Sequence, residues 1–86
     1  AQAVELLDGA IAALAEVERF EAEDIQAGLR ARLVDQAGCK PRVAFVPVRV
    51  AISGKRVSPP LFESMAILGR AACLARLRAL RDRLTD

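Results

Sequence analysis

The sequence contains no histidine, no tyrosine and no tryptophan among its 86 residues. Histidine is the most frequent general acid or base in enzymes and the commonest metal ligand, so its absence removes the usual routes to both kinds of site. Only two cysteines are present, Cys39 and Cys73, and neither belongs to a metal-binding spacing. We therefore expect no metal site and no catalytic residue in this chain, and we interpret both cysteines as reduced thiols, Cys73 in the core and Cys39 in a loop.

Long apolar runs are also absent. No stretch approaches the roughly 20 apolar residues that a membrane span needs, and the N-terminus lacks the basic and apolar regions of a secretory signal. These absences predict a cytoplasmic protein with no membrane partner. The pair Gly54 and Lys55 lacks the second glycine of a phosphate-binding loop, which argues against nucleotide binding by this segment.

Aromatic residues are scarce, at 3%, whereas hydrophobic residues make up 53% of the chain and are mostly alanine and leucine. Alanine and leucine favour helices, and aromatic and β-branched residues favour strands, so this composition favours packed helices over a sheet. A chain of this length forms one small domain.

Charge is divided unevenly along the sequence. Residues 1–39 contain three basic and eight acidic side chains, and residues 40–86 contain ten basic and three acidic ones, so the two parts carry net charges of −5 and +7. One interpretation is a surface that attracts a polyanion. The other is that the arginines of a C-terminal helix are solvated or pair with the acidic N-terminal half.

Two amphipathic segments occupy the N-terminal half. Apolar residues recur at spacings of three and four from Val4 to Val17, which predicts a helix. After a break near 18–21, the spacing from Ile25 to Leu33 predicts a second helix that ends at Gly38.

The segment 40–54 gives conflicting local signals. Its valines, isoleucine and phenylalanine favour a strand, whereas Pro47 argues against a central strand and Pro41 suits the first position of a helix. Beyond it, Ser58 and Pro59 form a helix-start signal, and Gly69 separates that short helix from a last one over 70–84.

One stretch, VRVAISGKRVSPPLFESMAILGR from Val48 to Arg70, matches a family pattern. It resembles the C-terminal end of bacterial glutamyl-tRNA synthetases, in which a PLRVALTG segment, a variable loop, SPxLFE and LLGR close the anticodon-binding domain. The matching residues are Pro47, Arg49, Ala51, Gly54, Ser58, Pro59, Leu61, Phe62, Glu63, Leu68, Gly69 and Arg70. The resemblance implies that 40–54 is helical, so we expect an all-α bundle of about five helices.

The resemblance also implies what the chain is part of. It implies that residues 1–86 form a single anticodon-binding domain, the C-terminal part of a larger ligase whose catalytic signatures lie upstream. Such a parent enzyme would join glutamate to its tRNA with ATP and Mg²⁺. The expected partners are therefore the tRNA anticodon loop, whose middle and third bases would be U and C, and the preceding domains of the synthetase.

By the same resemblance, Arg49 faces the anticodon, and Ser58, Pro59 and Leu61 lie against the same bases. A planar guanidinium suits base edges and phosphates, and unstacked loop bases expose those edges. The alternatives are an ion pair for Arg49 with another helix and core packing for Leu61. Four further basic residues are candidate phosphate contacts: Lys55, Arg56, Arg70 and Arg76.

A different class of function also fits the sequence. The apolar stripe from Val4 to Leu14 would serve a helical protein-interaction or structural module as a docking face.

Overall fold

A computed structural model describes residues 2–36, 38, 40–53 and 60–85, and every regular element in these ranges is a helix. The elements are α1 (Gln2–Glu16), α2 (Ala22–Leu29), the π-helical η1 (Arg30–Gln36), α3 (Pro41–Ala44), α4 (Val46–Ser53), α5 (Leu61–Leu68) and α6 (Arg70–Thr85). Since η1 continues α2 and a single turn residue joins α3 to α4, the described part of the chain contains five helical rods. The prediction of an all-α bundle of about five helices is confirmed.

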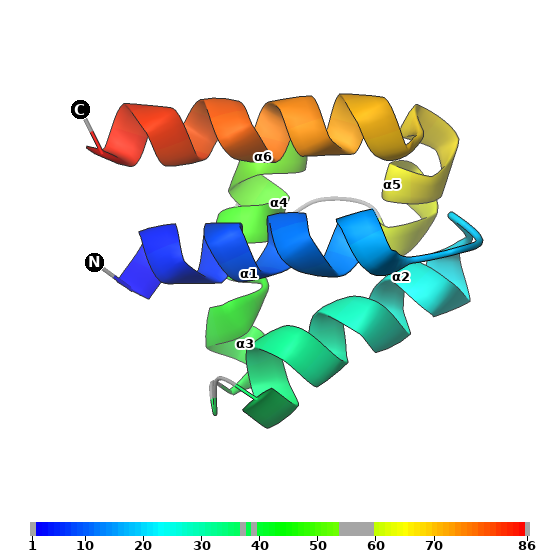
Figure 1. Ribbon diagram of the computed structural model, residues 1–86, viewed down its shortest axis with the longest axis horizontal. Helices are drawn as coiled ribbons and strands as arrows, with labels where there is room; N and C mark the ends of the chain where they lie inside the picture. Colours follow the sequence, from blue (N-terminus) through cyan, green and yellow to red (C-terminus); the bar gives the residue numbers. More distant parts are fainter. Residues whose placement is uncertain (1, 37, 39, 54–59, 86) are drawn as a thin grey trace.

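Helix α1 lies at the centre of the bundle. Figure 1 shows α6 running antiparallel beside it, α2 and η1 on its other side, and α4 crossing behind α1 and α6. Five side chains of α1 are therefore buried, on more than one face of the helix: Leu6, Leu7, Ala10, Ala13 and Leu14. The alternative prediction that this stripe docks an external partner is wrong, because the stripe packs inside the domain.

The second rod follows its predicted course. Its N-terminal turn carries Glu23 and Asp24, which complement the helix dipole. Ile25, Leu29 and Leu33 repeat every four residues and are all fully or almost fully buried. The Gly38 N–H donates to the carbonyl of Val34 at 3.0 Å, and Gly38 has a φ of 75°, so the helix ends where the sequence predicted.

The segment 40–54 is helical, as the resemblance implied. Pro41 begins α3, and the Lys40 carbonyl accepts the Ala44 N–H at 2.8 Å. The rod then bends at Phe45, because Pro47 has no N–H to donate to the carbonyl of Val43. Beyond the bend, Val48 and Ile52 turn inward together one helical turn apart, which is why α4 is a helix despite its β-branched composition.

Gly69 joins α5 to α6 without a loop. Its N–H donates to the Met65 carbonyl at 3.0 Å, and its own carbonyl accepts the Cys73 N–H at 3.1 Å. Its φ of 90° and ψ of 159° lie in a region that is almost exclusive to glycine. The described part of α5 begins after Pro60; the predicted cap Ser58 and first-turn Pro59 fall outside the described residues.

The core continues through α5 and α6. Leu61, Met65, Cys73 and Leu77 are buried, which confirms the predicted place of Cys73, and Cys39 falls outside the described residues. The apolar spacing of α6 continues to Leu84, but that side chain is 48% exposed, because the last turn of α6 extends beyond the buried core.

Candidate nucleic-acid interface

Arg49 lies on α4, next to the buried Val48, and is itself half-buried. It lies one helical turn after Phe45, on the same side of the helix. The ring of Phe45 meets that of Phe62 on α5 edge to face, with 5.5 Å between the ring centroids. This contact joins the turn that precedes α4 to α5. That Arg49 and the start of α5 face the same bases stays a prediction.

Leu61, in the first turn of α5, is less available for contact with RNA than the resemblance implied. The side chain of Leu61 is only 2% exposed and belongs to the hydrophobic core. The core-packing interpretation of Leu61 is therefore confirmed, and its side chain has almost no surface to offer to a base. The remaining predicted residues of this region, Lys55, Arg56, Ser58 and Pro59, lie outside the described residues.

Arg70 is engaged inside the domain. One of its terminal nitrogens, Nη2, donates hydrogen bonds to the carbonyls of Val17 and Glu18, just beyond the C-terminus of α1. Its guanidinium carbon also lies over the ring of Phe20, 5.5 Å from the centroid. A cation at a helix C-terminus satisfies carbonyls that have no partner within the helix. These contacts assign Arg70 to holding α6 against α1, so we do not retain it as a phosphate contact.

Arg76 makes a hydrogen bond within the domain and is also exposed to solvent. Its Nη1 donates a hydrogen bond to the carbonyl of Ile52 in the last turn of α4, while the residue as a whole is exposed. The arginine therefore secures the end of the helix that carries Arg49. It also acts on a neighbour: burial raises the pKa of the Cys73 thiol, and the positive charge of Arg76 partly opposes that rise.

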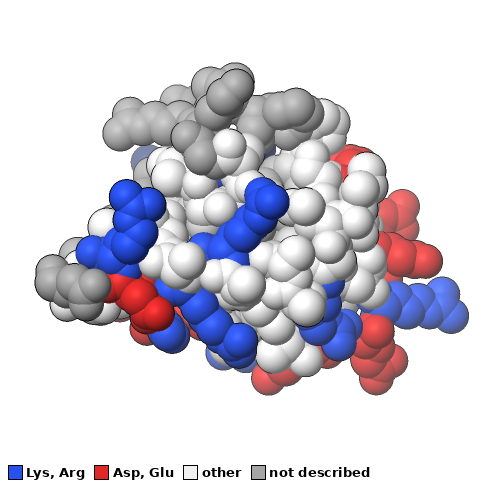
Figure 2. All heavy atoms as spheres, turned by 90° about the horizontal axis from the view of Figure 1, so that it is seen from above, with Lys and Arg blue, Asp and Glu red and all other residues white. Residues whose placement is uncertain are grey.

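Helix α6 supplies further basic side chains. Arg78 and Arg83 are exposed, whereas Arg81 pairs with Asp8 at 3.2 Å and with Asp82 at 3.1 Å. The hydrogen bond with Asp8, more than that with Asp82, raises the pKa of Arg81. Figure 2 shows the face over α6, where Lys and Arg side chains are spread across the surface and the visible Asp and Glu side chains lie toward its margins. The pairing interpretation of the basic half therefore holds for Arg81, and the attraction of a polyanion stays a prediction.

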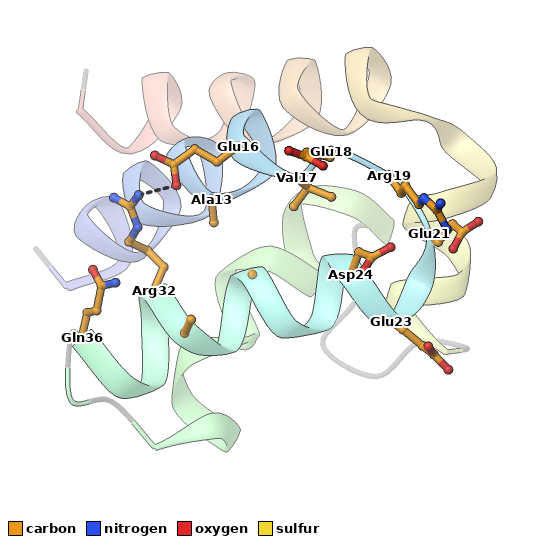
Figure 3. Close-up of a pocket in the computed structure, with 12 residues that line it drawn as sticks. Ala13, Glu16, Val17, Glu18, Arg19, Glu21, Glu23, Asp24, Arg32 and Gln36 are labelled. Atoms are coloured by element: carbon orange, nitrogen blue, oxygen red, sulfur yellow. Dashed lines mark hydrogen bonds and ion pairs between the residues drawn. The ribbon is translucent and has the colours of Figure 1, made fainter.

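A pocket with a volume of about 640 Å³ lies between the end of α1 and the α2–η1 rod. Figure 3 shows Glu18, Glu21, Glu23 and Asp24 around one end of it, and the Arg32–Glu16 ion pair, at 3.1 Å, at the other. Carboxylates repel a polyanion, and acidic residues outnumber the two basic ones in this lining, Arg19 and Arg32, so the pocket is less suited to RNA than the face over α6.

Other kinds of site find no support in the described residues. Within them, no three side chains of the His, Cys, Asp or Glu type come together as a metal site would require. None of the helices described is both long and apolar enough to cross a membrane.

Comparison with known proteins decides the family. The family model described as "Anticodon binding domain" matches residues 1–81. The chain belongs to this family. Its similar relatives include the glutamate–tRNA ligases of Arthrobacter sp. (strain FB24), 61% identical over 77 residues, and of Kocuria rhizophila, 57% identical over 82 residues. A third, from Kineococcus radiotolerans, is 52% identical over 83 residues.

The extent of these matches is asymmetric. They cover 90%, 95% and 96% of this anticodon-binding domain, but only 15%, 16% and 17% of the three ligases. The sequence resemblance to glutamyl-tRNA synthetases is thus confirmed over nearly the whole chain, and the domain spans about a sixth of the length of those relatives.

Proposed function

We propose that this domain recognises the anticodon of a glutamate tRNA as a module of a glutamate–tRNA ligase. The match of the anticodon binding domain model to residues 1–81 carries this proposal, and the ligase relatives supply the amino acid. The parent enzyme would ligate glutamate to the tRNA with ATP and Mg²⁺ in other domains, in the cytoplasm. The domain's own partners would be the anticodon loop and the preceding domains.

In this function the domain contributes specificity rather than chemistry. Binding energy from a correct anticodon, realised at a distance from the reacting atoms, holds the acceptor end of the tRNA productively in the active site. A wrong base leaves polar groups without partners, so the charging rate falls for that tRNA. The basic face over α6 and the acidic face around α2 are compatible with a polyanion approaching from one side only.

Arg49 is the side chain we assign to base recognition. It is half-buried, lies one helical turn after Phe45, and stands on a helix held at its C-terminal end by Arg76. A fixed helix limits where the guanidinium can reach, and a planar fork of donors discriminates between bases better than a point charge. Lys55 and Arg56, with Ser58 and Pro59, remain predicted contacts.

The test uses the full-length synthetase and tRNA transcripts whose middle and third anticodon bases are the expected U and C or are replaced. We expect Arg49→Ala to lower kcat/KM for the cognate tRNA by a factor equivalent to about 1–3 kcal/mol, because a base contact is lost. The ratio of kcat/KM between the cognate and the altered transcripts should become smaller. Replacing Lys55 and Arg56 together by alanine should weaken binding of all transcripts alike, since phosphates carry no sequence. Arg78→Ala is the charge-matched control.

Two outcomes contradict the proposal. If altering the anticodon leaves charging by the unmodified synthetase unchanged, the domain does not read these bases. If the double loop variant loses discrimination and Arg49→Ala loses only general affinity, the reading residues lie in the loop instead.

A further inference from the structure

A second recess lies on the other flank of α4, away from Arg49. It is a cleft of about 300 Å³ between α4 and α6, lined by Val50, Ala51, Arg76, Ala79, Leu80 and Arg83. Arg49 does not line it, because Val50 and Ala51 lie further round the helix. The volume is at the small end of the range for ligand sites. A cleft of this size accommodates a small part of an extended chain rather than a whole cofactor.

The lining has two parts of different chemistry. Val50, Ala51, Ala79 and Leu80 are aliphatic, and Arg76 and Arg83 are the charged residues among the described part of the lining. The two arginines are seven residues apart on α6, so they lie on the same face and about 10 Å apart along the helix axis. Among the described residues that line it there is no carboxylate, in contrast to the pocket beside α2.

One hydrogen bond links the two helices that form the cleft. The hydrogen bond from Arg76 Nη1 to the Ile52 carbonyl joins α6 to the last turn of α4 at the cleft. A guanidinium has five N–H donors, so one hydrogen bond to a carbonyl leaves others available to an anion. Arg83 stands in the last turn of α6 and is exposed. Arg76, held by this hydrogen bond, and the exposed Arg83 thus border an aliphatic floor.

We propose that this cleft binds the phosphodiester backbone of the tRNA, with Arg76 and Arg83 contacting phosphate oxygens and the aliphatic floor lying against the ribose. The proposal rests on the proposed function, because that function supplies the polyanion. Guanidinium groups bind phosphates strongly and bring no base preference of their own. The charge of the cleft favours RNA over an apolar protein segment. The seven-residue spacing of the arginines is a partial signal in the sequence, but only the packing of α4 supplies the floor.

The test measures binding of a tRNA transcript with the glutamate anticodon to the full-length synthetase across salt concentrations. Each phosphate contact contributes about 0.7–0.9 to the log–log salt slope. We expect Arg83→Gln to reduce the slope by about that amount, so that its loss of affinity between roughly 50 and 200 mM salt is about threefold smaller than that of the unmodified enzyme. Arg78→Gln is the matched control, since Arg78 is an exposed arginine of the same helix that does not line the cleft.

A second pair of variants tests the cleft without removing an arginine. Ala79 is exposed and lines the cleft, and Ala71 is exposed on the same helix outside it. Ala79→Glu places a carboxylate between the arginines and should weaken tRNA binding by roughly tenfold, because like charges repel. Ala71→Glu should change binding little. Melting of each variant checks that both remain folded.

The outcomes separate this inference from the function on which it rests. Equal effects of Arg83→Gln and Arg78→Gln, or of the two glutamate variants, would overturn the cleft while leaving anticodon discrimination by Arg49 intact. If Arg83→Gln lowers the melting temperature of the synthetase and leaves the salt slope unchanged, the inference is also overturned, since Arg83 then stabilises the protein and does not contact RNA. If the anticodon has no influence on charging, the proposed function fails whatever the cleft variants do.

Discussion

The contacts of Arg70 make a strong prediction about stability. This arginine stands in the first turn of α6 and donates hydrogen bonds to two carbonyls beyond the end of α1, and its guanidinium covers the ring of Phe20. Arg70→Ala removes all of these contacts at once. The carbonyl of Val17 then loses its charged donor, and α1 and α6 lose a link between residues 53 positions apart in the sequence.

The magnitude follows from the individual contacts. A hydrogen bond to a charged group contributes about 1.5–3 kcal/mol, and a partly exposed cation–π contact contributes about 0.5–1 kcal/mol. Water reaches part of the site, because Arg70 is half-buried, so we expect a loss of about 2–3 kcal/mol in the free energy of unfolding. For a domain of this size, each kcal/mol shifts the melting temperature by about 4–8 °C. The expected decrease is therefore roughly 8–24 °C.

Urea unfolding of the 86-residue chain, followed by circular dichroism, measures this loss. Arg78→Ala is the control, because it removes the same charge from an exposed position of the same helix and should cost less than about 0.5 kcal/mol. Arg70→Lys keeps the charge but loses the planar fork, so it should fall between the two. If Arg70→Ala and Arg78→Ala unfold at the same urea concentration, Arg70 does not hold the two helices together, and a role at the RNA surface becomes the better account.

Two further predictions concern α6 and its start. Burial raises the pKa of the Cys73 thiol, so the folded state holds its proton more tightly than the unfolded state. The contribution of this thiol to the free energy of unfolding should therefore be constant below about pH 8.5, the pKa of an unfolded cysteine, and should fall at higher pH. Urea titrations at several pH values should show that Cys73→Ala removes this fall. Gly69→Ala should cost about 1–3 kcal/mol, because alanine is strained at a φ of 90° although no atom lies within 4 Å of the added Cβ. An unfolding free energy equal to that of the unmodified chain would show that the turn relaxes without cost.

Local sequence rules predicted most of the helices but not the segment 40–54. Its valines and isoleucine favour a strand, and only the family resemblance indicated a helix there. The structure supplies the reason: Val48 and Ile52 fill the core beneath α1 and α6, and burial of these side chains outweighs a β propensity worth about 1 kcal/mol. The bend at Phe45 follows from Pro47, which a residue-by-residue analysis could have placed.

The partners of the site residues were much less predictable. Arg70 and Arg76 bond to carbonyls 53 and 24 residues away, and a backbone carbonyl leaves no mark in the sequence that would identify it as an acceptor. In the same way, an amphipathic stripe predicts that a helix face is covered but does not say by what. The stripe of α1 is covered by the rest of its own domain, so an interaction surface inferred from it was wrong.

These long-range contacts change the meaning of the basic C-terminal half. Its ten positive side chains suggested a broad electrostatic surface, yet Arg70 satisfies carbonyls at the end of α1, Arg76 does so at the end of α4, and Arg81 pairs with Asp8. Each of these arginines also stabilises the fold, because helix C-termini carry a partial negative charge and carboxylates a full one. The hydrogen bonds to carbonyls leave the charge of Arg70 and Arg76 in place but restrict their movement, whereas the ion pair with Asp8 neutralises Arg81. Recognition of one anticodon needs that orientation more than it needs charge, because phosphates are common to every tRNA and only positioned donors distinguish bases.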